Sequence, residues 1–155
     1  DLDTPNSANW TINAGAALAA DSVNAALSVM RFDDTTEEGV GFVLYIPTGA
    51  TNLVFRFVSR AQTAPGGAVT VRPVLYVREL VDNAAIEAWS SATLMTAIDI
   101  PTNANFQYDS QTISLATLSM VAGRAAQFEL TRRGTDGSDT LTGDWNLVQL
   151  VVEVT

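Results

Sequence analysis

Three reactive side chains are missing from this sequence: its 155 residues include no histidine, no cysteine and no lysine. Histidine is the usual proton shuttle near neutral pH, cysteine and lysine are common nucleophiles, and histidine and cysteine hold most zinc. These absences exclude Ser-His-Asp triads, Cys-His dyads, Schiff-base lysines and P-loop phosphate sites. A carboxylate pair or calcium held by oxygen ligands is the chemistry that remains. We therefore expect a binding or structural protein without a cofactor, not an enzyme.

Positive charge is also scarce, since eight arginines face 17 acidic residues and the formal net charge is −9. Such a chain repels nucleic acid and anionic membranes, so we expect neutral or cationic partners, or further copies of the chain. Hydrophobic residues make up 47% of the sequence, which is enough to fill a core. No apolar run approaches the roughly 20 residues that a membrane-spanning helix needs.

The apolar residues that are present recur with a period of two, which is typical of strands with one buried face. Pro73 interrupts one of the runs and predicts an edge position or a bulge there. Residues 21–155 are expected to form an antiparallel β-sandwich, a jelly roll of about eight strands, with an immunoglobulin-like sandwich as the alternative. The alternating runs lie at residues 25–30, 40–46, 53–58, 69–78, 112–115, 126–131 and 148–154.

Two segments depart from this alternation. Residues 1–20 are polar and alanine-rich and can bury little surface, so they are expected to form an extended N-terminal arm. Residues 82–90 begin with an Asx cap and then place apolar residues at helical spacing, which allows at most one short helix.

Acidic residues gather in two stretches where calcium is a possible ligand. Four acids occupy residues 33–38, and residues 137–144 look like one copy of the glycine/aspartate nonapeptide of calcium-binding β-rolls, a fold that needs many copies. A solvated acidic turn and a glycine-rich hairpin loop are the favoured interpretations, so no metal site is predicted. The weak calcium candidates are Asp33, Asp34, Glu37, Glu38, Asp136, Asp139 and Asp144.

A sugar site is the second candidate, because sandwiches bind sugars through exposed Trp or Tyr rings with polar side chains beside them. Trp89, Tyr108 and Asp109 lie in the region best placed to do this. The alternative is that Trp89 plugs the end of the sandwich and Tyr108 packs under a loop. Glycoside hydrolysis would need two facing acids, and the candidates Glu79, Glu87, Asp99 and Asp109 are scattered with no telling spacing.

An assembly interface is the third candidate. The arginines of residues 56–78 lie on the polar faces of two successive strand runs, and arginine suits bidentate pairing across interfaces. Three valines fall on strand positions opposite the core side, where a solvated face would be polar. The alternative is ordinary intrachain ion pairs at the surface. The predicted interface residues are Arg56, Arg60, Arg72, Arg78, Val43, Val54 and Val58.

Several stretches together resemble small β-sandwich domains of structural proteins in tailed bacteriophages: residues 32–42, Ile46-Pro47, residues 127–132 and residues 137–141. The resemblance implies a non-enzymatic virion protein, either a capsid decoration subunit or the head of a tail fibre. It also implies a homotrimer that meets other virion proteins, such as the major capsid protein. A glycan- or receptor-binding module, contacting a host surface glycan, is the alternative function.

Overall fold

The computed structural model describes residues 11–12, 17–20, 28–82, 84–85 and 88–155. Within these ranges the chain forms twelve strands and no helix, and the strand pairings are all antiparallel. The strands are β1 (Thr11–Ile12), β2 (Ala17–Ala20), β3 (Ser28–Phe32), β4 (Glu38–Tyr45), β5 (Asn52–Ala61), β6 (Val69–Val71), β7 (Pro73–Leu80), β8 (Thr93–Leu94), β9 (Ile98–Ile100), β10 (Gln107–Ser114), β11 (Ala125–Arg132) and β12 (Trp145–Val154).

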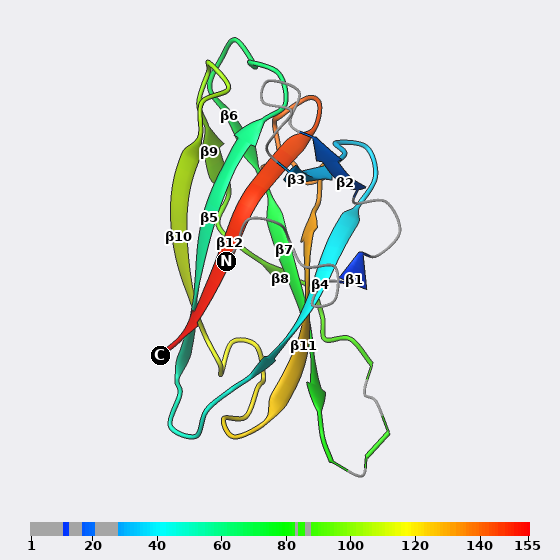
Figure 1. Ribbon diagram of the computed structural model, residues 1–155, viewed down its shortest axis with the longest axis vertical. Helices are drawn as coiled ribbons and strands as arrows, with labels where there is room; N and C mark the ends of the chain where they lie inside the picture. The colour runs from blue at the N-terminus through cyan, green and yellow to red at the C-terminus, as the bar shows by residue number, and fades with distance from the viewer. Residues whose placement is uncertain (1–10, 13–16, 21–27, 83, 86–87) are drawn as a thin grey trace.

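The strands form two five-stranded sheets and one small two-stranded sheet (Figure 1). Sheet A has the order β1-β4-β11-β7-β8, sheet B has the order β10-β5-β12-β3-β2, and β6 pairs with β9 as sheet C. Along the chain, β3, β4 and β5 alternate between sheets B and A, and so do β10, β11 and β12. This repeated crossing in an antiparallel sandwich is the arrangement of a jelly roll, so the predicted fold class is confirmed.

The core lies between the two large sheets and is centred on aromatic rings. Trp145 is fully buried, with its ring centroid 5.2 Å from that of Phe32 and 6.5 Å from that of Phe57. Phe42 and Phe128 stack across β4 and β11 at 5.3 Å. Each such buried ring stabilises the fold by about 1.5–3 kcal/mol. One continuous core therefore fixes the position of both sheets.

A bulge in β12 decides which residues of the last strand join this core. Leu147 pairs with Ser59 and Gln149 pairs with Val58, so Val148 is the extra residue. The bulge shifts the core-facing positions from odd to even numbers. Leu147 before it and Leu150 after it both pack against the core as a result.

Two irregularities expected from the sequence take a different form in the structure. Pro73 neither lies at an edge nor forms a bulge: the run breaks at Arg72, and Pro73 begins β7, which lies inside sheet A. A proline is tolerated as the first residue of a strand. The described residues of the expected helix, 82, 84–85 and 88–90, are turn and irregular backbone, while residues 83 and 86–87 lie outside the described part.

The expected N-terminal arm, residues 1–20, is described only at its two strands. β1 pairs with β4 in sheet A, and β2 pairs with β3 in sheet B. The rest of the segment lies outside the described residues, so the boundary between arm and sandwich at residue 21 stays a prediction. No described helix is long and apolar enough to span a bilayer.

One end of the sandwich is closed by a buried arginine on the core side of β11. The Arg132 guanidinium pairs with the Asp139 carboxylate at 2.9 Å, and both side chains are almost fully buried. Arg132 also donates hydrogen bonds to the carbonyl groups of Phe32, Leu141 and Gly143. Each guanidinium N–H therefore has an acceptor, which offsets the cost of burying the charge. The glycine-rich loop before β12 is held in this way.

Candidate functional site

The outer face of sheet A, which points away from the core, is built from β4, β11 and β7. β11 lies between the other two strands, and the register of the pairs sets which side chains are neighbours. Read across β4, β11 and β7, the rows are Gly39–Thr131–Val74, Gly41–Glu129–Tyr76, Val43–Gln127–Arg78 and Tyr45–Ala125–Leu80. We name as the aromatic face the residues Tyr45, Tyr76, Arg78, Trp89, Gln127 and Glu129.

Trp89 lies on a loop but is held against this face. The Ser90 N–H donates to the Val77 carbonyl at 2.7 Å, and the Val77 N–H donates to Ser90 Oγ at 3.0 Å. The guanidinium carbon of Arg78 lies 4.4 Å from the centroid of the Trp89 ring. Arg78 is itself fixed, because its Nε and Nη2 donate to Gln127 Oε1 at 2.8 and 2.6 Å. The indole therefore rests on a planar group tied to the sheet.

Tyr45 stands on the opposite side of the same face. Its side chain is 62% exposed, and the neighbouring Val43 is 56% exposed. The strand between Tyr45 and Trp89 carries Ala125 and Gln127, which are smaller than the aromatic rings. Two aromatic side chains therefore flank a central strand with small or polar side chains.

Polar groups on the central strand are available for a ligand. The Nε2 amide of Gln127 and the carboxylate of Glu129 make no hydrogen bond to another residue that the structure describes. Glu129 lies over Gly39, where an added Cβ would stand 2.6 Å from Glu129 Oε1. Because Gly39 has no side chain, it leaves room for the Glu129 carboxylate on this face. The aromatic face thus offers one donor group and one acceptor group beside its rings.

A hydrogen-bonded cluster fixes the end of the face at Tyr76. The Tyr76 hydroxyl donates to Glu37 Oε1 at 2.9 Å, Arg133 Nη2 donates to the Tyr76 hydroxyl at 2.7 Å, and Thr131 also donates to Glu37. Burial raises the pKa of Glu37, but the hydrogen bonds from Tyr76, Arg133 and Thr131 outweigh it and the pKa is lowered. Burial and then the Glu37 carboxylate raise the pKa of Tyr76. Glu37 is thus held as a carboxylate, and Tyr76 keeps its proton.

The three predicted glycan contacts do not lie together. Trp89 belongs to the aromatic face on sheet A, whereas Tyr108 points outward from sheet B, where it pairs with Val58 and is 73% exposed. Asp109, the next residue of the same strand, pairs with the core residue Phe57 and faces the opposite side. Neighbours in a strand point to opposite faces, so Tyr108 and Asp109 cannot share a site on one face. Trp89 does not plug the sandwich end, and Tyr108 does not pack under a loop.

The predicted calcium candidates each have a partner within the chain. Asp139 is tied to Arg132, Asp144 lies 3.6 Å from Arg31, and Glu37 belongs to the Tyr76 cluster. The remaining four accept backbone N–H groups: Asp33 from Thr35 and Thr36, Asp34 from Gly143, Glu38 from Asp33, and Asp136 from Ser138. In the described part of the chain, no three metal-ligating side chains are grouped for an ion. These acids shape turns and hold the loop before β12.

The predicted interface arginines are separated by the fold. Arg56 lies on sheet B and pairs with Glu153 at 3.0 Å, whereas Arg78 lies on sheet A. Arg60 is buried, and its guanidinium carbon lies 5.8 Å from the centroid of the Phe106 ring. The backbone N–H of Arg72 donates a hydrogen bond to the Asp139 carboxylate. The four arginines therefore do not form one continuous row, because the two successive strand runs, β5 and β7, lie in different sheets.

The predicted interface valines do face away from the core, but from different sheets. Val43 is exposed on sheet A, while Val54 and Val58 are half-buried on the outer face of sheet B. An interface role for these residues, and the trimer itself, stays a prediction.

The acids considered for glycoside hydrolysis are also dispersed. Glu79 on β7 pairs with Arg124, Asp99 is exposed on β9, and Asp109 lies on β10. These strands belong to three different sheets. Glu87 lies outside the described residues. The three described acids lie on separate strands and form no facing pair for hydrolysis.

Sequence reasoning missed most of the aromatic face. Tyr45, Tyr76 and Gln127 were not predicted as contacts, although each occupies the outward position of an alternating strand. An aromatic residue at an outward position is the signal that could have found the two tyrosines. Only the pairing of β4 and β7 with β11 brings them to one face.

Comparison with known proteins supports the fold. No family model matches the sequence, and no curated protein matches it. Among solved structures, the CBM22-2 xylan-binding domain from Paenibacillus barcinonensis Xyn10C has a TM-score of 0.60 and 12% identity, covering 100% of this chain and 97% of that chain. The N-terminal CBM22-1-CBM22-2 tandem domain of the same protein has a TM-score of 0.61 and 13% identity, covering 100% of this chain and 48% of that chain. The TM-scores show a shared fold, and at identities of 12% and 13% they show the fold alone.

A bacteriophage CBA120 tailspike domain is also similar, with 10% identity and a TM-score of 0.48. The match covers 97% of this chain, which spans only 20% of that chain. A TM-score at this level does not support an origin in a phage. Of the resemblance to phage structural proteins, the β-sandwich fold is confirmed by the sheet topology and by the xylan-binding domain described above. An origin in a phage stays a prediction.

Proposed function

We propose that this chain is a non-catalytic glycan-binding module and that the aromatic face is its binding surface. The observation that carries the proposal is the Trp89 ring stacked on Arg78, which Gln127 fixes to the sheet. One face of the indole covers Arg78, and the half-exposed ring offers the rest of its surface to the apolar face of a sugar ring. Tyr45 offers a second ring across β11, and Gln127 and Glu129 offer hydrogen bonds to hydroxyl groups.

The nature of the structural neighbours supports a glycan as the ligand. The neighbour with a TM-score of 0.60 is a xylan-binding domain, CBM22-2, and the neighbour with a TM-score of 0.61 is a tandem domain that includes CBM22-2. Xylan is therefore the first polysaccharide to test. Any glycan that binds the chain on a wider array is the next. The earlier main prediction, a capsid decoration or tail-fibre subunit, gains no support from the described residues. Location on a virion stays a prediction.

Binding to soluble xylan, measured by affinity electrophoresis and calorimetry, tests the proposal. Trp89→Ala is expected to weaken binding by about 2 kcal/mol, roughly thirtyfold, because the stacking platform is lost. Tyr108→Ala is the matched control, since it removes an exposed ring from the opposite sheet and is expected to leave affinity unchanged. If no glycan on an array binds the wild-type chain, the proposal is wrong. If Tyr108→Ala weakens binding and Trp89→Ala does not, the site has been placed on the wrong face.

A further inference from the structure

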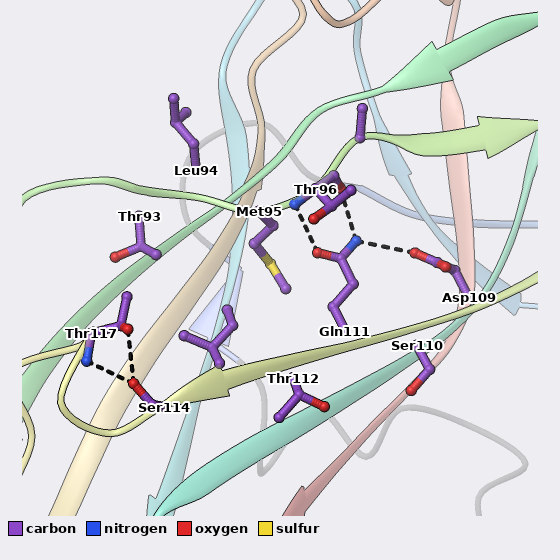
Figure 2. A pocket seen from close by; sticks show the side chains of 12 residues that line it. Thr93, Leu94, Met95, Thr96, Asp109, Ser110, Gln111, Thr112, Ser114 and Thr117 are labelled. Carbon is purple, nitrogen blue, oxygen red and sulfur yellow. Dashed lines mark hydrogen bonds between the residues drawn. The ribbon is translucent and has the colours of Figure 1, made fainter.

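A concave site lies at the open edge between the two sheets, apart from the aromatic face. It is formed by β10, the edge strand of sheet B, and by the segment that runs from β8 toward β9 (Figure 2). Its volume is about 460 Å³, and its lining comes from residues 93–97, residues 109–114 and Thr117. We name this site the open-edge groove.

Gln111 sets the width of the groove. Its Oε1 accepts the Thr96 N–H at 2.8 Å, and its Nε2 donates to the Thr96 carbonyl at 2.8 Å and to Asp109 Oδ2 at 3.0 Å (Figure 2). A side-chain amide thus makes the two hydrogen bonds that a neighbouring strand would make. The segment of residues 93–97 is held one side-chain length from the β10 backbone, which leaves the space open.

The lining combines hydroxyl groups with a small apolar floor. Ser114 Oγ and Thr117 Oγ1 lie 2.8 Å apart at one end, and Asp109 lies beyond Gln111 at the other. Met95 is buried beneath the groove, and Leu94 is 46% exposed at its wall. Among the described residues of this lining, Asp109 is the single charged one, and none is basic. Hydroxyl groups that both donate and accept suit a neutral polyol, whereas an anion would meet repulsion.

We propose that the open-edge groove binds a compact neutral saccharide of one or two rings, independently of the aromatic face. The groove volume lies in the range of roughly 300–1,000 Å³ that small-molecule sites occupy. An extended peptide fits less well, because the pairing of Gln111 with Thr96 closes the free edge of β10 in its middle. None of the described lining residues is aromatic, so we expect weak binding, with a dissociation constant on the order of millimolar.

Amide chemical shifts, followed by NMR during titration with xylobiose, test the proposal. The titration uses wild-type protein and a Trp89→Ala, Tyr45→Ala double variant that removes the aromatic face. Saturable shifts are expected at residues 95–96 and 111–117 in both proteins, with dissociation constants that agree within about twofold. Absence of saturable shifts at these amides in the wild type overturns the proposal, and so does their loss in the double variant. Failure of the aromatic face to bind xylan leaves this result untouched.

Blocking variants locate the ligand in the groove. Thr93→Trp fills it, Leu94→Trp narrows it from an exposed wall, and Ser91→Trp adds the same ring just outside as the control. Either blocking variant that folds is expected to weaken the groove shifts by at least about tenfold in dissociation constant. Unchanged shifts in a folded blocking variant overturn the placement.

Charge gives an independent arm of the same test. Glucuronate is expected to produce smaller shifts than xylobiose, because its carboxylate faces Asp109. Equal shifts with both sugars overturn the assignment of a neutral ligand.

Discussion

Aromatic side chains reach the surface on the outer faces of both sheets, but they differ in what lies beneath them. On sheet A, the Trp89 ring rests on Arg78, and Arg78 is fixed by Gln127. On sheet B, Tyr108 is more exposed than either Tyr45 or Trp89, and its pairing neighbour is Val58. A ring held in one orientation binds a ligand without losing further side-chain freedom. Exposure alone therefore does not identify the site.

Two arginines, Arg132 on sheet A and Arg56 on sheet B, show a similar contrast. Arg132 on β11 is buried, and each of its guanidinium N–H groups is hydrogen-bonded. Arg56 on β5 is 53% exposed, and its partner Glu153 is 46% exposed. Arg132 is therefore a fixed structural group, while Arg56 is a solvated surface charge. Variants of matched residues on the two sheets test this contrast.

The largest effect is expected on stability. Arg132→Met should lower the free energy of unfolding by about 3–5 kcal/mol, because Asp139 is left as a buried, unpaired charge. Arg56→Met, the matched control on sheet B, should leave the free energy of unfolding nearly unchanged, because solvent screens its exposed pair with Glu153. Urea denaturation of both variants measures the difference. Similar midpoints for the two variants would show that the buried pair contributes no more than the exposed one.

The next effect concerns the support beneath Trp89. Arg78→Met keeps the alkyl stem but removes the planar group, and it should weaken glycan binding by about 1.4 kcal/mol, roughly tenfold. Tryptophan fluorescence should change in the same variant, since the indole loses its cationic neighbour. Arg56→Met is again the control and should change neither signal. An unaltered affinity in Arg78→Met would mean that the ring needs no support.

A smaller effect is expected one step further from the ligand. Gln127→Leu removes the acceptor that fixes Arg78, together with a donor on the face, and should weaken binding about threefold to fivefold. Gln149→Leu on β12 makes the same change on the outer face of sheet B and should be neutral. Calorimetry on both variants distinguishes these outcomes. Equal losses would favour a general effect on the fold.

The smallest effect is a difference in pH dependence. The pKa of Glu37 is lowered from its ordinary value of 4.5, so its contribution to stability is present above that value. The contribution is lost as the pH falls through the lower folded pKa. The melting temperature should therefore fall less steeply between about pH 6 and pH 3 in Glu37→Gln than in the wild type.

Glu153 offers the comparison on sheet B. The hydrogen bond and the charge of Arg56 lower the pKa of Glu153, whose side chain is solvent-exposed. The effect of Glu153→Gln should vanish in high salt, whereas that of Glu37→Gln should persist in part, because the uncharged Tyr76 and Thr131 also donate hydrogen bonds to Glu37. Identical salt dependence in the two variants would contradict the difference between the faces.

The sequence predicts correctly those features that depend on the alternation within a single strand. Alternation placed Phe42 and Phe128 in the core and left Val43 outside it, as the structure has them. It failed where strands must be assigned to sheets. Arg56 and Arg78 lie on successive runs of the sequence, but their strands, β5 and β7, belong to opposite sheets. The bulge at Val148 and the break at Arg72 likewise depend on the partners that β12 and β7 meet.

By itself, the sequence determined the antiparallel sandwich, the apolar content of its core and the lack of the side chains that most enzymes use. These properties depend on residue types and on a period of two, which are local and can be read along the chain. The tertiary structure alone decided that Tyr45, Gln127 and Trp89 share a face, and that Tyr108 and Asp109 do not. Register and sheet order arise from contacts between distant segments, and no local pattern specifies them.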